Sequence, residues 1–163
     1  MEKIIVVDEK DNLLGAKERG SLTKEDIYRV SALWVKNSKE EILLAKRALT
    51  KKKDPGLWGP AVAGTVEEGE SYEQNILKEA EEELGLKNIK PMKLIKDRTK
   101  KPHNHFCQWF FLKLDKEAKK FKIQKEEVEE VKWFSKEEIE NLFDKNPPLI
   151  IPALKFFIKQ IKI

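Results

Sequence analysis

The segment at residues 64–86 constrains this chain most, because it concentrates negative charge between glycines. It holds eight acidic residues and one basic residue, Lys78, for a net charge of −7. Since the whole chain of 163 residues carries +4, the remainder carries +11. An acidic segment in a basic body suits a protein that binds divalent cations with its acids and a polyanion with its lysines. The alternative is a lysine-rich surface around one solvated, Glu-rich helix.

Residues 71–84 have the apolar spacing of a helix. At about 100° per residue, Glu82 lies about 60° to one side of Glu79 and Glu83 lies about 40° to the other, so the three carboxylates share one narrow face. Like charges at these spacings destabilise a helix by roughly a few tenths of a kcal/mol per pair, so a cation is expected beside them. Hard cations such as Mg²⁺ prefer oxygen ligands, which this face supplies.

Three glycines agree with this geometry. Gly64 is expected to end a strand where the chain turns closely past the cation site, Gly69 suits a turn before the helix, and Gly85 suits its C-terminal cap. Glu70 stands just ahead of the helix, where the helix dipole favours its charge and where it can reach back toward the acidic face. If the helix were simply solvated and the glycines incidental, the glycines and Glu70 would not need to stand at these positions.

The rest of the chain alternates short strands with a few helices. Strands are predicted at residues 3–7, 13–17, 27–35, 41–47, 57–64, 92–98, 105–114 and 128–134. Further helices are predicted at residues 135–143, where Ser135 and Glu138 suit a capping box, and at about 149–161 after Pro147 and Pro148. The order predicts an α/β fold with a mixed central sheet between helical layers, in a single domain of residues 1–163 with residues 1–20 as an appended β-hairpin.

Composition excludes several classes of protein. No apolar stretch of roughly 18 residues occurs, and no charged segment followed by an apolar one opens the chain, so neither a membrane span nor a signal peptide is expected, and the location is expected to be cytoplasmic. The single cysteine, Cys107, excludes an intramolecular disulfide and a cysteine zinc site, and it is expected to pack as a small apolar residue. The apolar face of the last helix is expected to pack on the sheet rather than on a membrane.

The acidic segment resembles the Nudix box, G-x5-E-x7-R-E-U-x-E-E-x-G-U, where U is a bulky aliphatic residue. The positions in register with that motif are Gly64, Glu70, Glu79, Glu82, Glu83, Gly85 and Leu86. Ala80 is a small occupant of the first aliphatic position, and Lys78 stands where the family has arginine. The resemblance implies a Nudix-type α/β/α sandwich.

The resemblance also implies an activity: metal-dependent hydrolysis of the phosphoanhydride in a nucleoside diphosphate linked to another group, with Mg²⁺ or alternatively Mn²⁺. By motif position it implies metal ligation by Glu79, Glu82 and Glu83, with the carbonyl of Ala63. It implies catalytic roles for Glu79, Glu82 and Lys78, with Glu79 a candidate base; Lys78 offers a point charge where arginine would make a planar contact. A later loop often supplies one more acid, for which the candidates are Glu126, Glu127, Glu129 and Glu130.

Residues 43–58 resemble isopentenyl-diphosphate isomerases, which share the Nudix fold, and the hydrolases related to them. In that group the positions of Arg47 and Lys51 contact a diphosphate, and a guanidinium with an ammonium suits that ligand. We therefore expect Arg47, Lys51 and Glu70 to contribute to substrate binding. A small-molecule diphosphate is the expected partner.

The isomerase activity itself is disfavoured. Isomerases of this group use a cysteine and a metal-binding histidine where this chain has Ala63 and Thr65, and a Glu-x-Glu pair where it has His103-Asn104-His105. Without the thiol and the carboxylate, proton transfer across an alkene lacks its acid and base. His103 and His105 are spaced to share one face of a strand, and they are candidates for substrate binding, against a purely structural role.

Two further classes of function stay open. A Nudix-fold module that binds a nucleotide or a protein without chemistry is compatible with Lys78 in place of arginine. An RNA-binding protein would suit the basic body, but the sequence has no aromatic-basic platform for RNA, so nucleic acid is not expected as a partner. A homodimer is compatible with the sequence.

Overall fold

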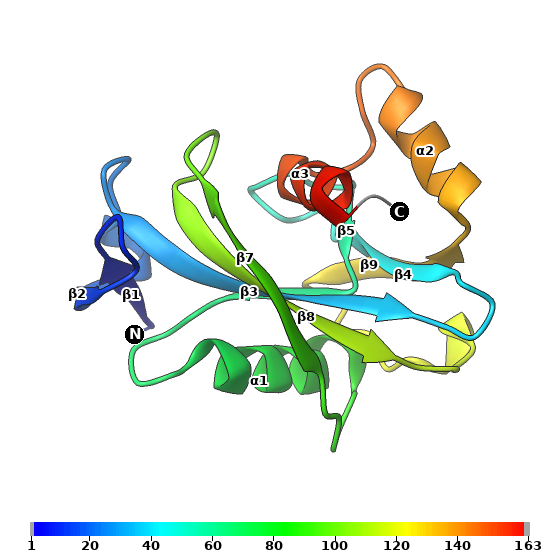
Figure 1. The fold of residues 1–163 in the computed structure, drawn as a ribbon, viewed down its shortest axis with the longest axis horizontal. Coiled ribbons are helices and arrows are strands. Elements are labelled where there is room, and N and C mark those ends of the chain that lie inside the picture. The colour runs from blue at the N-terminus through cyan, green and yellow to red at the C-terminus, as the bar shows by residue number, and fades with distance from the viewer. Residues whose placement is uncertain (1, 162–163) are drawn as a thin grey trace.

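The structure, a computed structural model, describes residues 2–161. Within this range a mixed sheet of nine strands runs through the molecule, with helices on both faces (Figure 1). The strands are β1 (Lys3–Val7), β2 (Leu13–Glu18), β3 (Ile27–Lys36), β4 (Ile42–Arg47), β5 (Trp58–Pro60), β6 (Val62–Thr65), β7 (Met92–Thr99), β8 (His105–Lys113) and β9 (Val128–Phe134). The helices are α1 (Tyr72–Leu84), α2 (Lys136–Asp144) and α3 (Pro152–Ile161), with 3-10 turns at Arg19–Ser21 and Ala118–Lys120. The predicted α/β class is confirmed.

Strand β3 is the centre of the sheet. It pairs antiparallel with β1, β4 and β6, and parallel with β8 from Tyr28↔His105 to Lys36↔Lys113. Strand β7 pairs with β8, and β5 and β9 both pair with β4. Strands β6 and β8 are therefore held in register by one common neighbour, β3.

The alternation of side chains along β3 builds a hydrophobic core on each face. Leu33 and Val35 pack in one cluster with Ile76 of α1, and Trp34 packs in the other with Phe157 of α3. The Trp109 ring stacks on Phe157 at a centroid distance of 3.7 Å. Full burial of one such side chain contributes about 1.5–3 kcal/mol, which holds α3 on the sheet as its apolar face predicts. No helix within residues 2–161 is long and apolar enough to cross a membrane.

Two predicted boundaries and one predicted helix cap differ from the structure. Residues 57–64 form two short strands, so Gly64 lies inside β6 instead of ending a strand. The last helix starts at Pro152 and not near residue 149, because the preceding segment is extended beside β5: Trp58 donates to the Leu149 carbonyl at 2.8 Å and accepts from the Ile151 amide at 2.9 Å. At α2, Ser135 accepts from the Glu138 amide at 3.2 Å, which is half of the predicted capping box.

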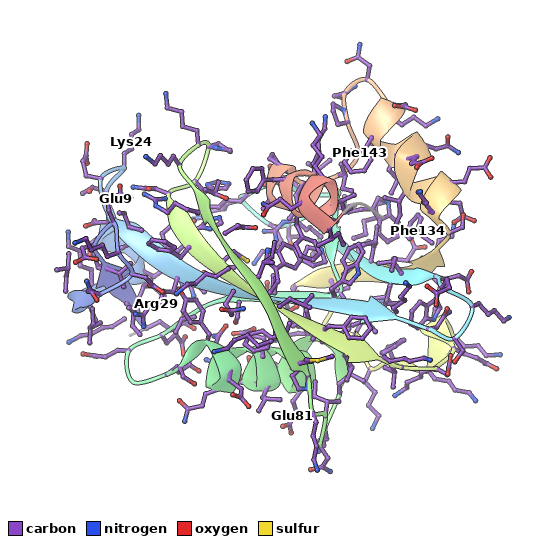
Figure 2. The ribbon with its side chains drawn as sticks, viewed as in Figure 1. Glu9, Lys24, Arg29, Glu81, Phe134 and Phe143 are labelled. Atoms are coloured by element: carbon purple, nitrogen blue, oxygen red, sulfur yellow. The ribbon has the colours of Figure 1, made fainter. Side chains whose placement is uncertain are left out.

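The turn between β1 and β2 is fixed to the body of the molecule through Asp11. Its carboxylate accepts from Arg29 Nε at 2.7 Å, from Lys96 Nζ at 2.7 Å and from the Tyr72 hydroxyl at 2.9 Å. Figure 2 shows Arg29 and Glu9 at this end of the sheet. Through Asp11 the hairpin is tied to β3, β7 and α1 together.

Candidate active site

Helix α1 is bounded by local signals at both ends. The Ser71 hydroxyl accepts from the Gln74 amide at 3.1 Å, and the Gln74 side chain accepts from the Ser71 amide at 2.9 Å, which completes a capping box that the sequence analysis did not identify. Gly85 ends the helix at φ +67°, a left-handed conformation that favours glycine. These caps fix where the acidic face starts and ends, so the helix predicted at residues 71–84 is confirmed to within one residue.

Gly64 allows α1 to lie close to β6. A Cβ atom added to Gly64 would lie 2.7 Å from Glu79 Cδ, closer than real Cβ contacts allow, and 3.0 Å from Glu79 Oε1. The carboxylate of Glu79 therefore occupies the space that any other residue at position 64 would fill. This contact accounts for the glycine six residues before Glu70 better than the predicted end of a strand does.

Asn75 fixes α1 on the sheet and was missed by the sequence analysis. Its side-chain oxygen accepts from the Ser31 hydroxyl of β3, and its amide nitrogen donates to the Thr65 carbonyl at 3.1 Å and to Glu70 at 3.2 Å. The group is fully buried, and buried polar groups require such partners. Its signal in the sequence is an amide next to Ile76 on the helix face that packs on the sheet.

Glu79 and Glu83 are two acids one helical turn apart on α1, of which Glu83 is buried and Glu79 is partly buried. Burial, and then the nearby charge of Glu82, raise the pKa of Glu79 to about 7. Burial, and then the charge of Glu79, raise the pKa of Glu83 well above its ordinary range. Two acidic side chains one helical turn apart, both disfavoured as anions by burial, form a place that a cation suits, because the cation would balance both negative charges.

The third acid of the motif, Glu82, is exposed, and Ala63 lies in β6 opposite Ala32. Across residues 2–161, no three His, Cys, Asp or Glu side chains are already gathered tightly enough to hold one metal ion. The donors nevertheless fit a hard divalent cation, since all of them are oxygens and Glu79 and Glu83 are already adjacent.

Lys78 lies beside this pair and forms ion pairs with the acids around it. Its Nζ lies 2.6 Å from Glu67, 2.8 Å from Glu70 and 3.9 Å from Glu79. Burial alone would lower the pKa of Lys78, but the hydrogen bonds to Glu67 and Glu70 outweigh it and raise the pKa above its ordinary value. Glu70 also accepts from the Glu67 amide at 2.8 Å. One ammonium group therefore joins the loop before α1 to the acidic face.

Four acids were candidates for the additional acid of the site. Among them, Glu127 is the one whose charge contributes to raising the pKa of Glu83. Its carboxylate pairs with Lys51, which brings a basic residue to the edge of the acidic cluster. Loop and helix are also tied by a bond of 2.9 Å from the Gln124 amide to the Glu83 carbonyl. Arg47 lies nearby in sequence at the end of β4, where its Nε donates to the Lys53 carbonyl at 2.9 Å.

The two histidines lie away from the acids. His105 starts β8 and shares a sheet face with Cys107 and Trp109, which pack toward α3, so it lies on the face opposite α1. His103 precedes the strand, so the two do not share one strand face; its Nε2 is 3.9 Å from Asp54. Cys107 is buried in the apolar cluster under α3, as predicted.

The fold and this arrangement define a class of α/β proteins in which a capped, glutamate-rich helix packs on a glycine of a mixed sheet. The chain belongs to the Nudix family: residues 27–154 match the model described as the NUDIX domain. Both the resemblance seen in the sequence and the Nudix-type fold are thereby confirmed.

Some relatives match nearly the whole chain, and others match only part of it. A protein of Listeria monocytogenes described as an uncharacterized Nudix hydrolase is 29% identical over 99% of this chain and 94% of its own length. Another so described, from Yersinia pestis, is 27% identical over 97% and 86%. An isopentenyl-diphosphate Delta-isomerase of Citrobacter koseri is 32% identical over 56% of this chain and 52% of the isomerase.

Solved structures show the same fold at low identity. A crystal structure of a Deinococcus radiodurans protein matches with a TM-score of 0.85 and 21% identity, covering 98% of both chains. The NUDIX domain of Shewanella oneidensis NrtR, solved in complex with ADP ribose, matches with a TM-score of 0.62 and 18% identity, covering 90% of this chain and 92% of that one.

Proposed function

We propose that this protein is a divalent-metal-dependent hydrolase that cleaves the phosphoanhydride bond of a nucleoside diphosphate linked to another moiety. The observation that carries the proposal is the pair of acids on α1, the partly buried Glu79 packed against Gly64 and the buried Glu83 one turn further along. Membership in the Nudix family supports the proposal. Two relatives that match this chain over nearly its whole length are described as Nudix hydrolases, which also supports it.

In this proposal Glu79, Glu82 and Glu83 hold the cation, with the carbonyl of Ala63 as a further ligand. Mg²⁺ suits a set of oxygen donors, and Mn²⁺ is the alternative. When bound, the cation neutralises phosphate oxygens and lowers the pKa of a water molecule.

The protein's own residues would orient the reactants and accept a proton. A water oxygen bonds to phosphorus, the bridging P–O bond breaks with its electrons going to the leaving phosphate, and the proton lost by the water goes to a carboxylate. Glu79 is the candidate acceptor of that proton. Lys78 acts as a positioning residue, because it holds Glu70 and Glu79 relative to each other. Arg47 and Lys51 would attract the diphosphate.

Two other functions are less well supported. An alkene isomerase would need an acid and a base beside its substrate, and the single cysteine of this chain is buried below α3. A binding module without chemistry would assign no catalytic role to Glu79 and Glu83. The small-molecule diphosphate is therefore the partner that we propose.

The test is a hydrolysis assay over a panel of nucleoside diphosphate derivatives, nucleoside triphosphates and dinucleoside polyphosphates, with Mg²⁺, Mn²⁺ or EDTA. Products are identified by mass spectrometry in water enriched in ¹⁸O, which reports the phosphorus atom attacked. We expect metal-dependent turnover that falls at least 100-fold in Glu83→Gln. Glu81→Gln is the matched control, because Glu81 is exposed on the side of α1 that faces away from the sheet (Figure 2). Absence of turnover across the panel would contradict the proposal.

A further inference from the structure

Helix α1 lies along one face of the sheet (Figure 1), and the side chain of Asn75 is fully buried where this helix meets β3. The side-chain oxygen accepts from the Ser31 hydroxyl of β3. The amide nitrogen donates to the Thr65 carbonyl at 3.1 Å and to Glu70 Oε1 at 3.2 Å. Because a carbonyl and an ionised carboxylate can only accept, these partners fix the orientation of the amide. Its donors are therefore committed to the strand before α1 and to the acid before α1.

The two oxygens of Glu70 are held by different donors. Oε1 accepts from Asn75 and from the Glu67 amide at 2.8 Å, and Oε2 lies 2.8 Å from Lys78 Nζ. Burial alone would raise the pKa of this carboxyl, but the hydrogen bonds from these three donors outweigh it and lower the pKa below its ordinary value. Glu70 is therefore held as an anion in one orientation, with a helix side chain on each oxygen.

The lysine at position 78 explains why two helix side chains are needed. An arginine guanidinium presents a planar set of N–H donors and can contact both oxygens of a carboxylate, whereas an ammonium group is a point charge. The ammonium group of Lys78 lies 2.8 Å from Glu70 Oε2 and 2.6 Å from Glu67, so it is shared between two acids. The side-chain donor for the other oxygen of Glu70 comes from Asn75, one turn earlier on the same face of α1.

Asn75 is connected to Glu79 by two routes. The first is the ion-pair network, because Lys78 Nζ lies 3.9 Å from Glu79 Oε1. The second is β6, where Asn75 donates to the Thr65 carbonyl. The adjoining residue, Gly64, is the one against which the Glu79 side chain packs. Loss of the Asn75 amide should therefore displace the candidate proton acceptor.

We propose that Asn75 is a positioning residue for the hydrolysis: Asn75 and Lys78 each hold one oxygen of Glu70, and together they make the contact that an arginine at position 78 could make alone. This inference rests on the proposed function, since it assigns a further residue to that reaction. The shared hold on one carboxylate exists without metal or substrate. It can therefore be tested separately from turnover.

The kinetic test is a double-mutant cycle between positions 75 and 78. Asn75→Ala is expected to lower kcat roughly tenfold or more and to leave KM within about twofold, because a positioned group is displaced and no substrate contact is removed. In the Lys78→Arg protein the same substitution is expected to lower kcat by less than about threefold, because arginine can contact both oxygens of Glu70. An equal loss in the two backgrounds would show that Asn75 acts independently of position 78 and would overturn the proposal.

Asn37→Ala is the matched control, because Asn37 is also a buried asparagine, 8% exposed, with its own hydrogen bonds in the turn after β3. It donates to the Glu41 carboxylate at 2.9 Å and accepts from the Lys39 and Glu41 amides at 2.9 Å. Asn37→Ala should lower the melting temperature and leave kcat unchanged. Asn75→Leu is the second variant at the site, because leucine fills the volume that alanine leaves empty and still removes both N–H donors. Unchanged kcat in a folded variant at position 75 would contradict the positioning role.

The same cycle, measured on stability, does not depend on the proposed function. Urea denaturation in EDTA gives the free energy of unfolding of the wild type, the two single variants and the double variant. The loss caused by Asn75→Ala is expected to be smaller in the Lys78→Arg background, where Glu70 keeps a second side-chain donor. Additive losses would overturn the inference, whether or not the protein hydrolyses any substrate. Coupled losses without turnover in the wild type would support the shared hold on Glu70 and contradict the proposed hydrolysis.

Discussion

The backbone of Gly64 lies directly against the side chain of Glu79, with room for no Cβ atom between them: such an atom would be 2.7 Å from Glu79 Cδ. The two residues are fifteen positions apart and belong to β6 and α1. Their contact sets the distance between the sheet and the acidic face, so it decides where the carboxylate of Glu79 is held.

Replacing Gly64 with alanine should therefore displace Glu79. We expect the free energy of unfolding to fall by about 1–3 kcal/mol, the range for overpacked sites, and the rate of hydrolysis to fall at least tenfold. Urea denaturation and steady-state kinetics measure the two effects. Gly15→Ala is the control, because a Cβ atom at Gly15 meets nothing within 4 Å. Full activity in Gly64→Ala would show that the contact is not needed.

Removing the metal should lower the melting temperature of the protein. A cation held by Glu79 and Glu83 binds the folded state, so Mg²⁺ should raise the melting temperature in a concentration-dependent way. The increase should disappear in Glu83→Gln and persist in Glu81→Gln. Differential scanning fluorimetry with an EDTA reference checks this, and an equal Mg²⁺ effect in both variants would argue against a site at Glu83.

Lys78 should tolerate arginine but not a neutral residue. Arginine keeps a positive charge between Glu67, Glu70 and Glu79 and adds a planar set of donors. We expect kcat of Lys78→Arg to be at or above that of the wild type, and kcat of Lys78→Gln to fall roughly tenfold or more, a loss typical of a displaced catalytic group. If glutamine were as good as lysine, the bracing role would be wrong.

Asp97 should make stability depend on pH. Burial raises its pKa from 3.8 to about 6, against the opposing hydrogen bond of 2.9 Å from Trp109 Nε1. The folded state therefore favours the protonated acid, so stability decreases as pH rises from about 4 through 6 and then levels off, by at most about 3 kcal/mol. The free energy of unfolding of the wild type, measured from pH 4 to 8, should show this decrease. Asp97→Asn keeps an acceptor for Trp109, and its free energy of unfolding should lack the part of the decrease that Asp97 causes.

The attachment of the hairpin depends on Asp11, whose side chain is 7% exposed and has three partners. Removing one member of a buried ion pair costs about 3–5 kcal/mol, so Asp11→Ala should lower the free energy of unfolding by an amount near that range. Glu9→Gln is the comparison: Glu9 pairs with Arg98 but is 64% exposed, and exposed ion pairs stabilise a fold much less than buried ones. Similar losses in both variants, measured by urea denaturation, would contradict a special role for Asp11.

Local sequence information was sufficient for α1 and its acids. The boundaries of this helix follow from residues within one turn of its ends, such as Ser71 and Gly85, and the spacing of Glu79, Glu82 and Glu83 follows from the helix itself. The last helix shows the opposite case: its first turn was predicted too early, because pairing of residues 149–151 with Trp58 overrides local preference.

The sequence alone therefore determined the class of fold, the acidic helix and the family resemblance, because each is encoded by neighbours along the chain. Only the tertiary structure decided that the charge of Glu127 acts on Glu83, that Asn75 ties α1 to Ser31, and that His105 lies on the opposite face of the sheet. Those relationships depend on strand register and on loop closure between residues distant in sequence, for which spacing along the chain carries no physical signal.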